Sequence, residues 1–311
     1  MRRISILGLV ALSCFAASTP LVRAATLKVN CDHHQTISHA LKVVTASNPQ
    51  GPNTIEVSGT CRENVSVQSL SRVTLAAKNG ASISDVTGGQ ASVVGIVDSQ
   101  SITVQGFTIE GGSNGVLCAY ASVCYLDSNT IQKASGSGVN VTHSSAAFLS
   151  SNVVKNSNAL GMSINFDSRA LSFGDIFQEN TGSAVRVLAS YFLCQGSTIL
   201  NNGSDGSPGI IGLEGARLRF GRCTISNNLG DGVELLDGTE GRVIDGNVIT
   251  ANAGNGVTLG DLSFARFAGV EPFNNITGNL SGTDVACTPQ FSATRGALTN
   301  IGGGITNCIE P

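Results

Sequence analysis

The stretch CTISNNLGDGVELLDGTEGRVIDGNVITANAGNGVTL, residues 223–259, contains one pattern twice and indicates the fold. A short apolar phrase ends at Ile225 and again at Ile249, and a glycine stands seven residues after each of them. Each glycine opens an alternating segment, Gly-Val-Glu-Leu at 232–235 and Gly-Val-Thr-Leu at 256–259. Because alternation with β-branched residues is typical of half-buried strands, the pattern predicts short strands joined by tight turns.

The same phrase recurs along most of the chain. Its last apolar residue stands at Ile109, Ile131, Val154, Phe177, Ile199, Ile225, Ile249 and Ile276, at spacings of 22 to 27 residues. Leucine-rich repeats have a similar period, but they need regularly placed leucines and often a helix, whereas glycine and asparagine interrupt every segment here. The period therefore predicts a solenoid of about ten coils, each with three short strands that pair with their equivalents above and below.

Asparagines support this alignment. In five consecutive coils an asparagine follows the apolar anchor by three residues, at Asn180, Asn202, Asn228, Asn252 and Asn279. Stacked asparagines can hydrogen-bond along the axis of a solenoid and tolerate the backbone conformation of a tight turn. We expect this column to be an internal ladder with a structural role.

The first 24 residues have the features of a secretory signal peptide. Arg2 and Arg3 precede an apolar run, and Val22-Arg23-Ala24 is compatible with cleavage after Ala24. A lipoprotein signal ending at Cys14 is the alternative, although the residues before it form a poor lipobox. No other apolar run is long enough to span a bilayer, so we expect a secreted or periplasmic protein without a membrane span.

The rest of the chain divides into three parts. Residues 25–50 are expected to form an N-terminal cap with an amphipathic helix, because Ile37, Ala40, Leu41 and Val44 recur at helical spacing. Residues 51–285 form the predicted solenoid, and residues 286–311 a C-terminal cap. Lys+Arg 18 against Asp+Glu 21 argues against a general nucleic-acid binder, and 41% hydrophobic residues argue against disorder. We expect a monomer.

Eight cysteines remain after removal of the signal, and no CxxC motif is present. An even number in an exported chain indicates disulfides rather than a metal site. Although many connectivities are open, the simplest is sequential pairing, Cys31–Cys61, Cys118–Cys124, Cys194–Cys223 and Cys287–Cys308. The first and last pairs would close the two ends of the solenoid.

Residues 54–65, 73–75 and 102–104 resemble the opening coils of pectate lyase-like right-handed parallel β-helix proteins. The later Asn-x-Ile and Gly-Val phrases are similar to repeats in carbohydrate-binding and sugar-hydrolysing members, so the resemblance covers residues 26–285. It implies a single-domain, all-β, right-handed parallel β-helix. The motifs of polygalacturonases, pectinesterases and alginate epimerases do not occur in this sequence.

Acidic residues at equivalent positions of neighbouring coils are the candidate catalytic groups. Asp237 and Asp261 follow equivalent strands, and carboxylates about 5 Å apart would raise one another's protonation or share a cation. The candidate acid/base set is Glu214, Glu234, Asp237 and Asp261. A solvated acidic edge is the alternative. We expect no cofactor; a calcium ion could bind here, but no calcium motif is present.

Arginines and asparagines on outward positions are the candidate glycan-binding groups. They are Asn140, Asn165, Arg186, Arg217, Arg219 and Arg242, and Arg222 and Arg266 add to the basic character of the same coils. Arginine forks suit sugar carboxylates or sulfates. His143 could serve as a general base, and His33, His34 and His39 are weak metal candidates because no spaced ligand set completes a site.

These features favour a secreted protein that binds a polysaccharide or cell-surface glycan without a demonstrated reaction. The alternative is a lyase or glycoside hydrolase that acts on an acidic, uronate-containing glycan. Binding is favoured because tryptophan is absent and only Tyr120, Tyr125 and Tyr191 could stack on sugars. The repeats also contain no large loop insertion to wall a catalytic cleft.

Overall fold

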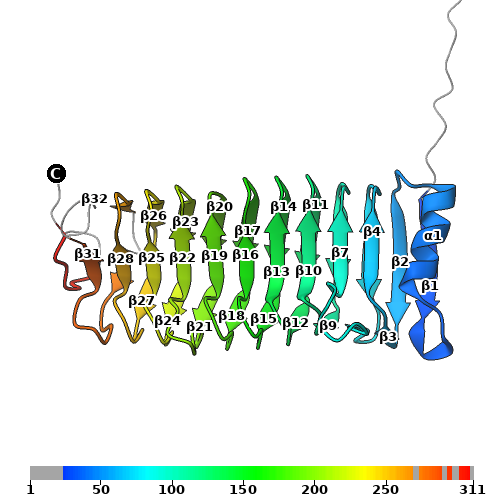
Figure 1. Ribbon diagram of the computed structural model, residues 1–311, viewed down its shortest axis with the longest axis horizontal. Helices are drawn as coiled ribbons and strands as arrows, with labels where there is room; N and C mark the ends of the chain where they lie inside the picture. Colours follow the sequence, from blue (N-terminus) through cyan, green and yellow to red (C-terminus); the bar gives the residue numbers. More distant parts are fainter. Residues whose placement is uncertain (1–23, 269–272, 289–292, 296–300, 309–311) are drawn as a thin grey trace, which may run out of the picture.

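The computed structural model describes residues 24–268, 273–288, 293–295 and 301–308. The predicted signal peptide, apart from Ala24, and parts of the predicted C-terminal cap lie outside these residues. Strands follow one another along a single long axis, with one α-helix at the N-terminal end (Figure 1). The prediction of an all-β parallel solenoid with an N-terminal helix is confirmed.

Three parallel sheets run the length of the solenoid, and we name them A, B and C. Sheet A has twelve strands, in the order β1 (Ala25–Asn30), β2 (Asn53–Ser58), β5 (Val73–Ala77), β8 (Ile102–Gln105), β11 (Val123–Asp127), β14 (Ala146–Ser150), β17 (Arg169–Phe173), β20 (Tyr191–Gln195), β23 (Arg217–Gly221), β26 (Glu240–Ile244), β29 (Phe264–Ala268) and β32 (Ala293–Arg295). It begins with β1, so regular sheet pairing starts within the segment expected to be the N-terminal cap.

Sheets B and C have ten strands each in the described residues, in agreement with about ten coils. Sheet B contains β3 (Thr60–Arg62), β6 (Ser82–Ser84), β9 (Thr108–Glu110), β12 (Thr130–Gln132), β15 (Val153–Lys155), β18 (Ile176–Gln178), β21 (Thr198–Leu200), β24 (Thr224–Ser226), β27 (Val248–Thr250) and β30 (Asn275–Ile276). Sheet C contains β4 (Val65–Gln68), β7 (Val94–Val97), β10 (Asn114–Ala119), β13 (Ser137–Thr142), β16 (Met162–Ile164), β19 (Val185–Leu188), β22 (Ile210–Leu213), β25 (Val233–Leu235), β28 (Val257–Leu259) and β31 (Val285–Cys287).

The repeat register predicted from the apolar anchors is the register of sheet B. Ile109 pairs with Ile131, Ile131 with Val154, and the pairing continues without a slip to Ile276. All eight anchors are fully buried. Since side chains alternate between the two faces of a strand, one buried residue in each short strand of sheet B suffices to fix its inward face.

The predicted asparagine ladder is present and is completely buried. Asn180, Asn202, Asn228 and Asn252 each donate a hydrogen bond from Nδ2 to the Oδ1 of the next asparagine, at 2.9 to 3.1 Å. The last member, Asn279, donates to the carboxylate of Asp284 at 2.9 Å. Every acceptor oxygen of the ladder, including that of Asp284, also accepts the backbone N–H of the asparagine that donates its Nδ2 to it, so the ladder satisfies buried polar groups of the turns.

A second buried ladder lies between sheets A and B and was not predicted. Asn129 donates to Asn152 at 3.0 Å, and Asn152 donates to the carboxylate of Asp175 at 2.8 Å. Farther along the solenoid Asn247 donates to Asn274 at 2.8 Å. Asp175 is fully buried, and this burial raises the pKa of its carboxyl group. These residues are the first residue of the repeated phrase in their coils.

The first ladder requires glycine at the start of several strands of sheet C, at Gly161, Gly209, Gly232 and Gly256. A Cβ atom on Gly232 would lie 2.9 Å from Nδ2 of Asn252 and 2.6 Å from the carbonyl oxygen of Gly256. The same would hold at Gly256, where Nδ2 of Asn279 would be 2.7 Å away. Real Cβ atoms are almost never found this close to such groups. The Gly-Val phrase and the asparagine column are therefore two halves of one packing unit.

Helix α1 (Ile37–Ser47) covers the N-terminal end of the solenoid, and a disulfide joins β31 to Cys308 near the other end. The helix buries Ile37, Ala40, Leu41 and Val44 as predicted, and Glu63 of the first coil accepts hydrogen bonds from its first backbone N–H groups. The 3₁₀-helix η1 (Cys31–His33) is joined to β3 by the disulfide Cys31–Cys61. All four sequential disulfides are present, which confirms the predicted connectivity: Cys31–Cys61, Cys118–Cys124, Cys194–Cys223 and Cys287–Cys308.

Candidate functional site

A hollow lies on the outer face of sheet A, beside the turns that lead from sheet C into sheet A. It has a volume of about 910 Å³. Its floor is formed by outward residues of successive strands, which pair in the order Val123, Ala146, Arg169, Tyr191 and Arg217. Its wall is formed by the turns themselves, so a groove exists although the repeats contain no large loop insertion. We call it the sheet A groove.

The wall of the groove owes its shape to left-handed turns. His143 and Ser144 have φ angles of 54° and 57°, and Phe166 and Asp167 repeat this conformation one coil later. The chain turns sharply here and leaves the small residues Ala121, Ser144 and Ala189 along the groove. Asp167 is the acidic residue of the lining, and Arg169 and Arg217 are its basic residues.

Aromatic rings lie in the groove and beside it. Tyr125 and Phe148, from adjacent strands, stack with ring centroids 5.0 Å apart, and the guanidinium of Arg169 lies 5.9 Å from the centroid of Phe148. Phe148 and Tyr191 belong to the groove lining itself. Flat apolar rings next to guanidinium groups present the two kinds of contact that a sugar acid can use, with its ring face and its carboxylate.

A smaller hollow of about 160 Å³ continues the groove toward the C-terminal end. Tyr191 and Arg217 line both hollows, and Arg219, Glu240 and Arg242 line the second. Arg219 pairs with Arg242, and Arg242 with Arg266, so three exposed arginines form one column. Arg242 also contacts Glu240 of its own strand, with 3.0 Å between Nε and Oε1. The basic segment predicted from the sequence is therefore one continuous surface.

The candidate catalytic acids divide into two groups. Glu214, Asp237 and Asp261 lie in the turns between sheets C and A of three successive coils, each with a left-handed φ. The backbone N–H of Gly238 donates to the carbonyl oxygen of Asp261 at 2.8 Å, so these turns stack as expected. Glu234 instead lies in the middle of β25 and points outward from sheet C. The structure does not gather all four acids at one place.

The surroundings of Glu234 alter its acidity. It is half-buried, and its pKa is raised, first by burial and then by the negative charge of Asp231. Asp231 precedes β25 and accepts a hydrogen bond from the backbone N–H of Asn255 at 2.7 Å. The charged neighbour of Glu234 is thus Asp231, a residue outside the predicted set, and not Asp237.

Three predicted binding residues lie on sheet C, away from the sheet A groove. Asn140, Ser163 and Arg186 occupy one outward column, which continues through Ile211 to Glu234. Asn165 is buried at the end of β16 and hydrogen-bonds to Ser163 at 3.0 Å. The guanidinium of Arg186 contacts the Ser163 hydroxyl at 3.4 Å, while its Nε is buried without a hydrogen-bond partner. Arg217, Arg219 and Arg242, by contrast, lie on sheet A.

The histidines have no arrangement that points to metal binding. His143 lies in an exposed stack between Tyr120 and Phe166, with centroid distances of 4.6 and 5.1 Å. Within the described ranges, three metal-ligating groups come together only at Cys31, Cys61 and Glu63, where the two cysteines are already joined by a disulfide. In the same part of the chain, no helix has the length and apolar character required to cross a membrane.

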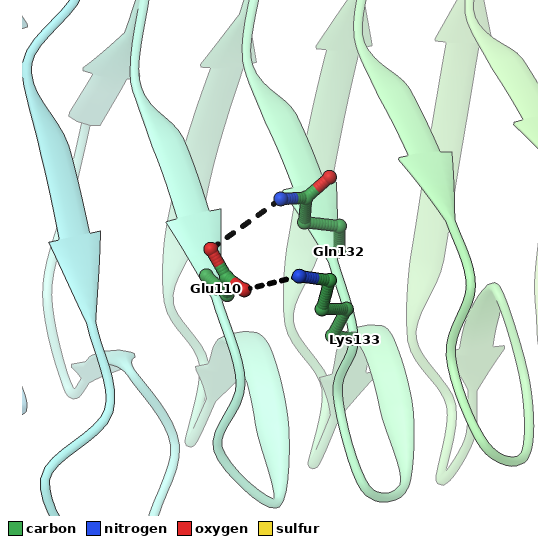
Figure 2. Close-up of polar contacts among 3 residues, drawn as sticks. All are labelled: Glu110, Gln132 and Lys133. Carbon is green, nitrogen blue, oxygen red and sulfur yellow. Dashed lines mark hydrogen bonds and ion pairs between the residues drawn. The ribbon is translucent and has the colours of Figure 1, made fainter.

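The outer face of sheet B carries an ion pair between neighbouring coils, formed by Glu110 and Lys133. Figure 2 shows Glu110 of β9 reaching toward the next coil, where Lys133 lies 2.7 Å and Gln132 3.4 Å from its carboxylate oxygens. The hydrogen bond from Lys133 lowers the pKa of Glu110. Exposed pairs of this kind contribute less than about 1 kcal/mol, and the pair leaves no net charge for a ligand.

Comparison with known families identifies the repeats. A family model described as the right-handed beta helix region matches residues 92–288, more than half of the chain. The chain belongs to the right-handed β-helix family. This β-helix therefore has the hand that the resemblance implied. No curated protein matches it in sequence.

Solved structures share the fold at low sequence identity. The A-module of the Azotobacter vinelandii mannuronan C-5 epimerase AlgE6 is 14% identical, with a TM-score of 0.66 and coverage of 91% of this β-helix and 96% of the module. Pectate lyase Pel9A is 12% identical, with a TM-score of 0.58 and coverage of 90% and 80%. Tailspike protein 2 of the Escherichia coli O157:H7 bacteriophage CAB120 is 11% identical, with a TM-score of 0.64 and coverage of 86% and 42%. The β-helix is thus pectate lyase-like in architecture.

Proposed function

We propose that this protein is an exported polysaccharide-binding β-helix that holds an acidic glycan in the sheet A groove. The observation that carries the proposal is the continuous lining of the two hollows, in which Phe148 and Tyr191 alternate with Arg169, Arg217 and Arg242. Rings bind the apolar faces of sugars, and arginines bind carboxylates with charge-assisted hydrogen bonds. The four disulfides agree with an oxidising compartment, where such glycans occur.

The arginines provide the first test of this proposal. Replacing Arg217 with glutamine removes a charge shared by both hollows, so we expect the affinity for polygalacturonate to fall about tenfold. The double variant R169Q/R217Q should lose about a hundredfold. Isothermal titration calorimetry with oligomers of defined length measures both values. The control is Arg62→Gln, an exposed arginine in β3 of sheet B. Unchanged affinity in the double variant would contradict the proposal.

A uronate-specific lyase or hydrolase on sheet C is the second candidate. Glu234 favours it, because a half-buried carboxyl group with a raised pKa can act as a general acid nearer neutral pH than an ordinary glutamate. Arg186 lies two coils away in the same outward column, so a uronate held by its guanidinium would place the neighbouring sugars toward Glu234.

This second function makes a separate prediction. If polyuronates are cleaved, Glu234→Gln should reduce turnover at least a hundredfold, because the amide keeps the shape but has no proton to transfer. Activity of the unaltered protein should decline as the pH rises through the raised pKa, since a general acid works only in its protonated form. Reducing-end and ultraviolet assays detect hydrolysis and elimination. Asp237→Asn in the neighbouring exposed turn is the matched comparison; if only that variant were inactive, the chemistry would belong to the acidic turns.

A further inference from the structure

Strand β1 forms the N-terminal edge of sheet A, beside helix α1 (Figure 1). Asn30, at the end of β1, donates its backbone N–H to Oε1 of Gln35 at 2.7 Å and accepts the backbone N–H of Gln35 at 3.3 Å. Because the backbone groups of successive strand residues point to opposite sides, those of Thr26 and Lys28 point the same way as those of Asn30, away from β2. Within the described residues no hydrogen bond occupies these four groups, so this edge can pair with another strand.

A hollow of about 630 Å³ lies beside this edge and is lined by β1 and helix α1 together. Leu27 and Val29 of β1 and Ala40 and Val43 of α1 give it apolar walls. The Val43 side chain is 40% exposed, so part of this apolar wall is open to solvent. Proteins bind extended peptides with such an arrangement: the strand edge supplies backbone hydrogen bonds, and the hollow takes alternate side chains of the peptide. The lining of this hollow shares no residue with the sheet A groove.

The titratable side chains of this hollow are all basic. They are Lys28, His34 and His39, and no aspartate or glutamate belongs to the lining. Lys28 is exposed on the outer face of sheet A, where its register partner in β2 is Glu56. Glu56 forms its ion pair with Lys78, at 3.1 Å, so Lys28 has no ion-pair partner among the described residues. A carboxylate on a strand added beside β1 can lie opposite Lys28, where opposite charges stabilise strand pairing.

We propose that the edge of β1 binds an extended segment of another protein, and that this segment alternates aliphatic with acidic side chains. The segment adds one strand to sheet A and hydrogen-bonds to the free backbone groups of Thr26 and Lys28. Its aliphatic side chains lie on the same face as Leu27 and Val29 and fill the hollow beside Val43. Its carboxylates lie on the opposite face, with Lys28. This inference does not depend on glycan binding, because the two surfaces are separate.

Two other occupants of this edge fit its charges less well. Two copies of this chain joined edge to edge through β1 would bring their Lys28 side chains near each other, and like charges on paired strands are destabilising. The segment that precedes β1, residues 1–23, contains three arginines and no aspartate or glutamate. A segment with carboxylates, from another protein, therefore matches the edge best.

The probe is an octapeptide that alternates valine with glutamate and is blocked at both ends, titrated into the purified protein by isothermal titration calorimetry. An octapeptide with lysine in place of glutamate should bind about tenfold more weakly. Two further peptides carry backbone N-methyl groups on the valines alone or on the glutamates alone. Since alternate N–H groups of the added strand face β1, one of these peptides should lose about tenfold in affinity and the other should bind like the unmodified peptide. The weakened peptide also reveals the strand direction: methylated valines interfere in a parallel pairing, and methylated glutamates in an antiparallel one.

Variants of the protein locate the peptide. Lys28→Glu should weaken binding of the glutamate peptide about tenfold and strengthen binding of the lysine peptide by a similar factor, because the cross-strand charge is reversed. Val43→Ser should weaken binding of both peptides about fivefold, because it removes apolar surface from the hollow. The control Lys155→Glu makes the same charge change in β15 of sheet B and should leave both affinities unchanged. Circular dichroism spectra establish that each variant is folded.

Four results would overturn this inference. The first is an absence of binding by the glutamate peptide, and the second is equal affinity of the two methylated peptides, which would exclude pairing with the edge. The third is binding that appears only after residues 1–24 are removed, which would make the chain's own N-terminal segment the occupant. The fourth is a dimer in sedimentation velocity that the peptide dissociates, which would assign the edge to a second copy. Polygalacturonate titrations of the same samples report on the sheet A groove independently.

Discussion

Replacing Asn228 with alanine is expected to lower the free energy of unfolding by about 2 to 4 kcal/mol. The Oδ1 atom of Asn228 accepts hydrogen bonds from both the backbone and the side-chain nitrogen of Asn202, and its Nδ2 donates to Asn252. All three residues are fully buried, so no water replaces the lost partner. After the substitution, the backbone N–H of Asn202 has no acceptor in the interior, which costs about 1 to 3 kcal/mol, and two further buried hydrogen bonds are lost. The Nδ2 of Asn202 keeps its bonds to the carbonyl oxygens of Phe177 and Leu200, and the Oδ1 of Asn252 keeps the backbone N–H of residue 228.

Urea unfolding monitored by circular dichroism measures this change. The control is Asn158→Ala, because Asn158 is exposed and its φ is not left-handed; its substitution should alter the unfolding free energy by no more than about 0.5 kcal/mol. A long repeat array can lose coils in stages, so midpoint and slope are compared together. If Asn228→Ala unfolded at the same urea concentration as the unaltered protein, the ladder could not be a principal source of stability.

Replacing Gly232 with alanine is expected to cost about 2 to 4 kcal/mol, although the change adds a single methyl group. The new Cβ would lie 2.6 Å from the carbonyl oxygen of Gly256, 2.8 Å from Cγ2 of Ile249 and 2.9 Å from Nδ2 of Asn252. Two of these contacts are with groups fixed by the sheet and the ladder, and overpacking of a close-packed interior usually costs 1 to 3 kcal/mol or more. The thermal midpoint should fall by several degrees.

Gly95→Ala is the matched control for this prediction. Gly95 lies inside β7 of the same sheet, its φ is not left-handed, and a Cβ would meet only the carbonyl oxygen of Val65 at 3.9 Å. The added methyl group has room there and reduces the freedom of the unfolded chain, so the substitution should be neutral or slightly stabilising. Similar losses in both variants would show that backbone preference, and not the approach to the ladder, is responsible.

Most of the architecture could be predicted because every coil of a solenoid has the same pattern of buried residues and hydrogen bonds. The apolar anchors from Ile109 to Ile276 fix the inward face of sheet B, and a buried side chain in one coil implies an equivalent in the next. The column from Asn180 to Asn279 was predicted as a ladder for the same reason. Helix α1 followed from its own spacing of apolar residues, and the disulfides from the order of the cysteines.

The second ladder was not predicted, although its asparagines occupy the same position of the repeat in several coils. Asn129, Asn152, Asn247 and Asn274 were visible as the first residue of the repeated phrase, but Asp175, Ser197 and Cys223 interrupt the column. Serine and aspartate continue the same hydrogen bonding with a different side chain: Asp175 donates its backbone N–H to the hydroxyl of Ser197 at 3.1 Å. A search for one residue type cannot find a column that is defined by acceptor position.

The location of the groove could not be obtained from the repeat either. The repeat period predicts which residues point outward on all three sheets. The presence of a groove depends instead on how far a turn projects above the neighbouring strands. That height comes from the left-handed turns at residues such as His143 and Phe166, for which the sequence has no glycine signal. The candidate acids lie in β25 of sheet C and in the turns that follow the strands of that sheet, whereas the described groove lies on sheet A with Arg169, Phe148 and Tyr191, which were not predicted as a group.

The direction of the asparagine ladder gives the solenoid an electrical polarity. Every amide from Asn180 to Asn252 donates toward the C-terminal end, so the side-chain dipoles point the same way and add, as peptide dipoles add in an α-helix. The positive end of this row lies at Asn279, where the carboxylate of Asp284 accepts its last hydrogen bond. Asp175 ends the row from Asn129 in the same way. In both of these rows an acidic side chain lies at the positive end of the summed dipole. A neutral residue at that place would leave the positive end without a compensating charge.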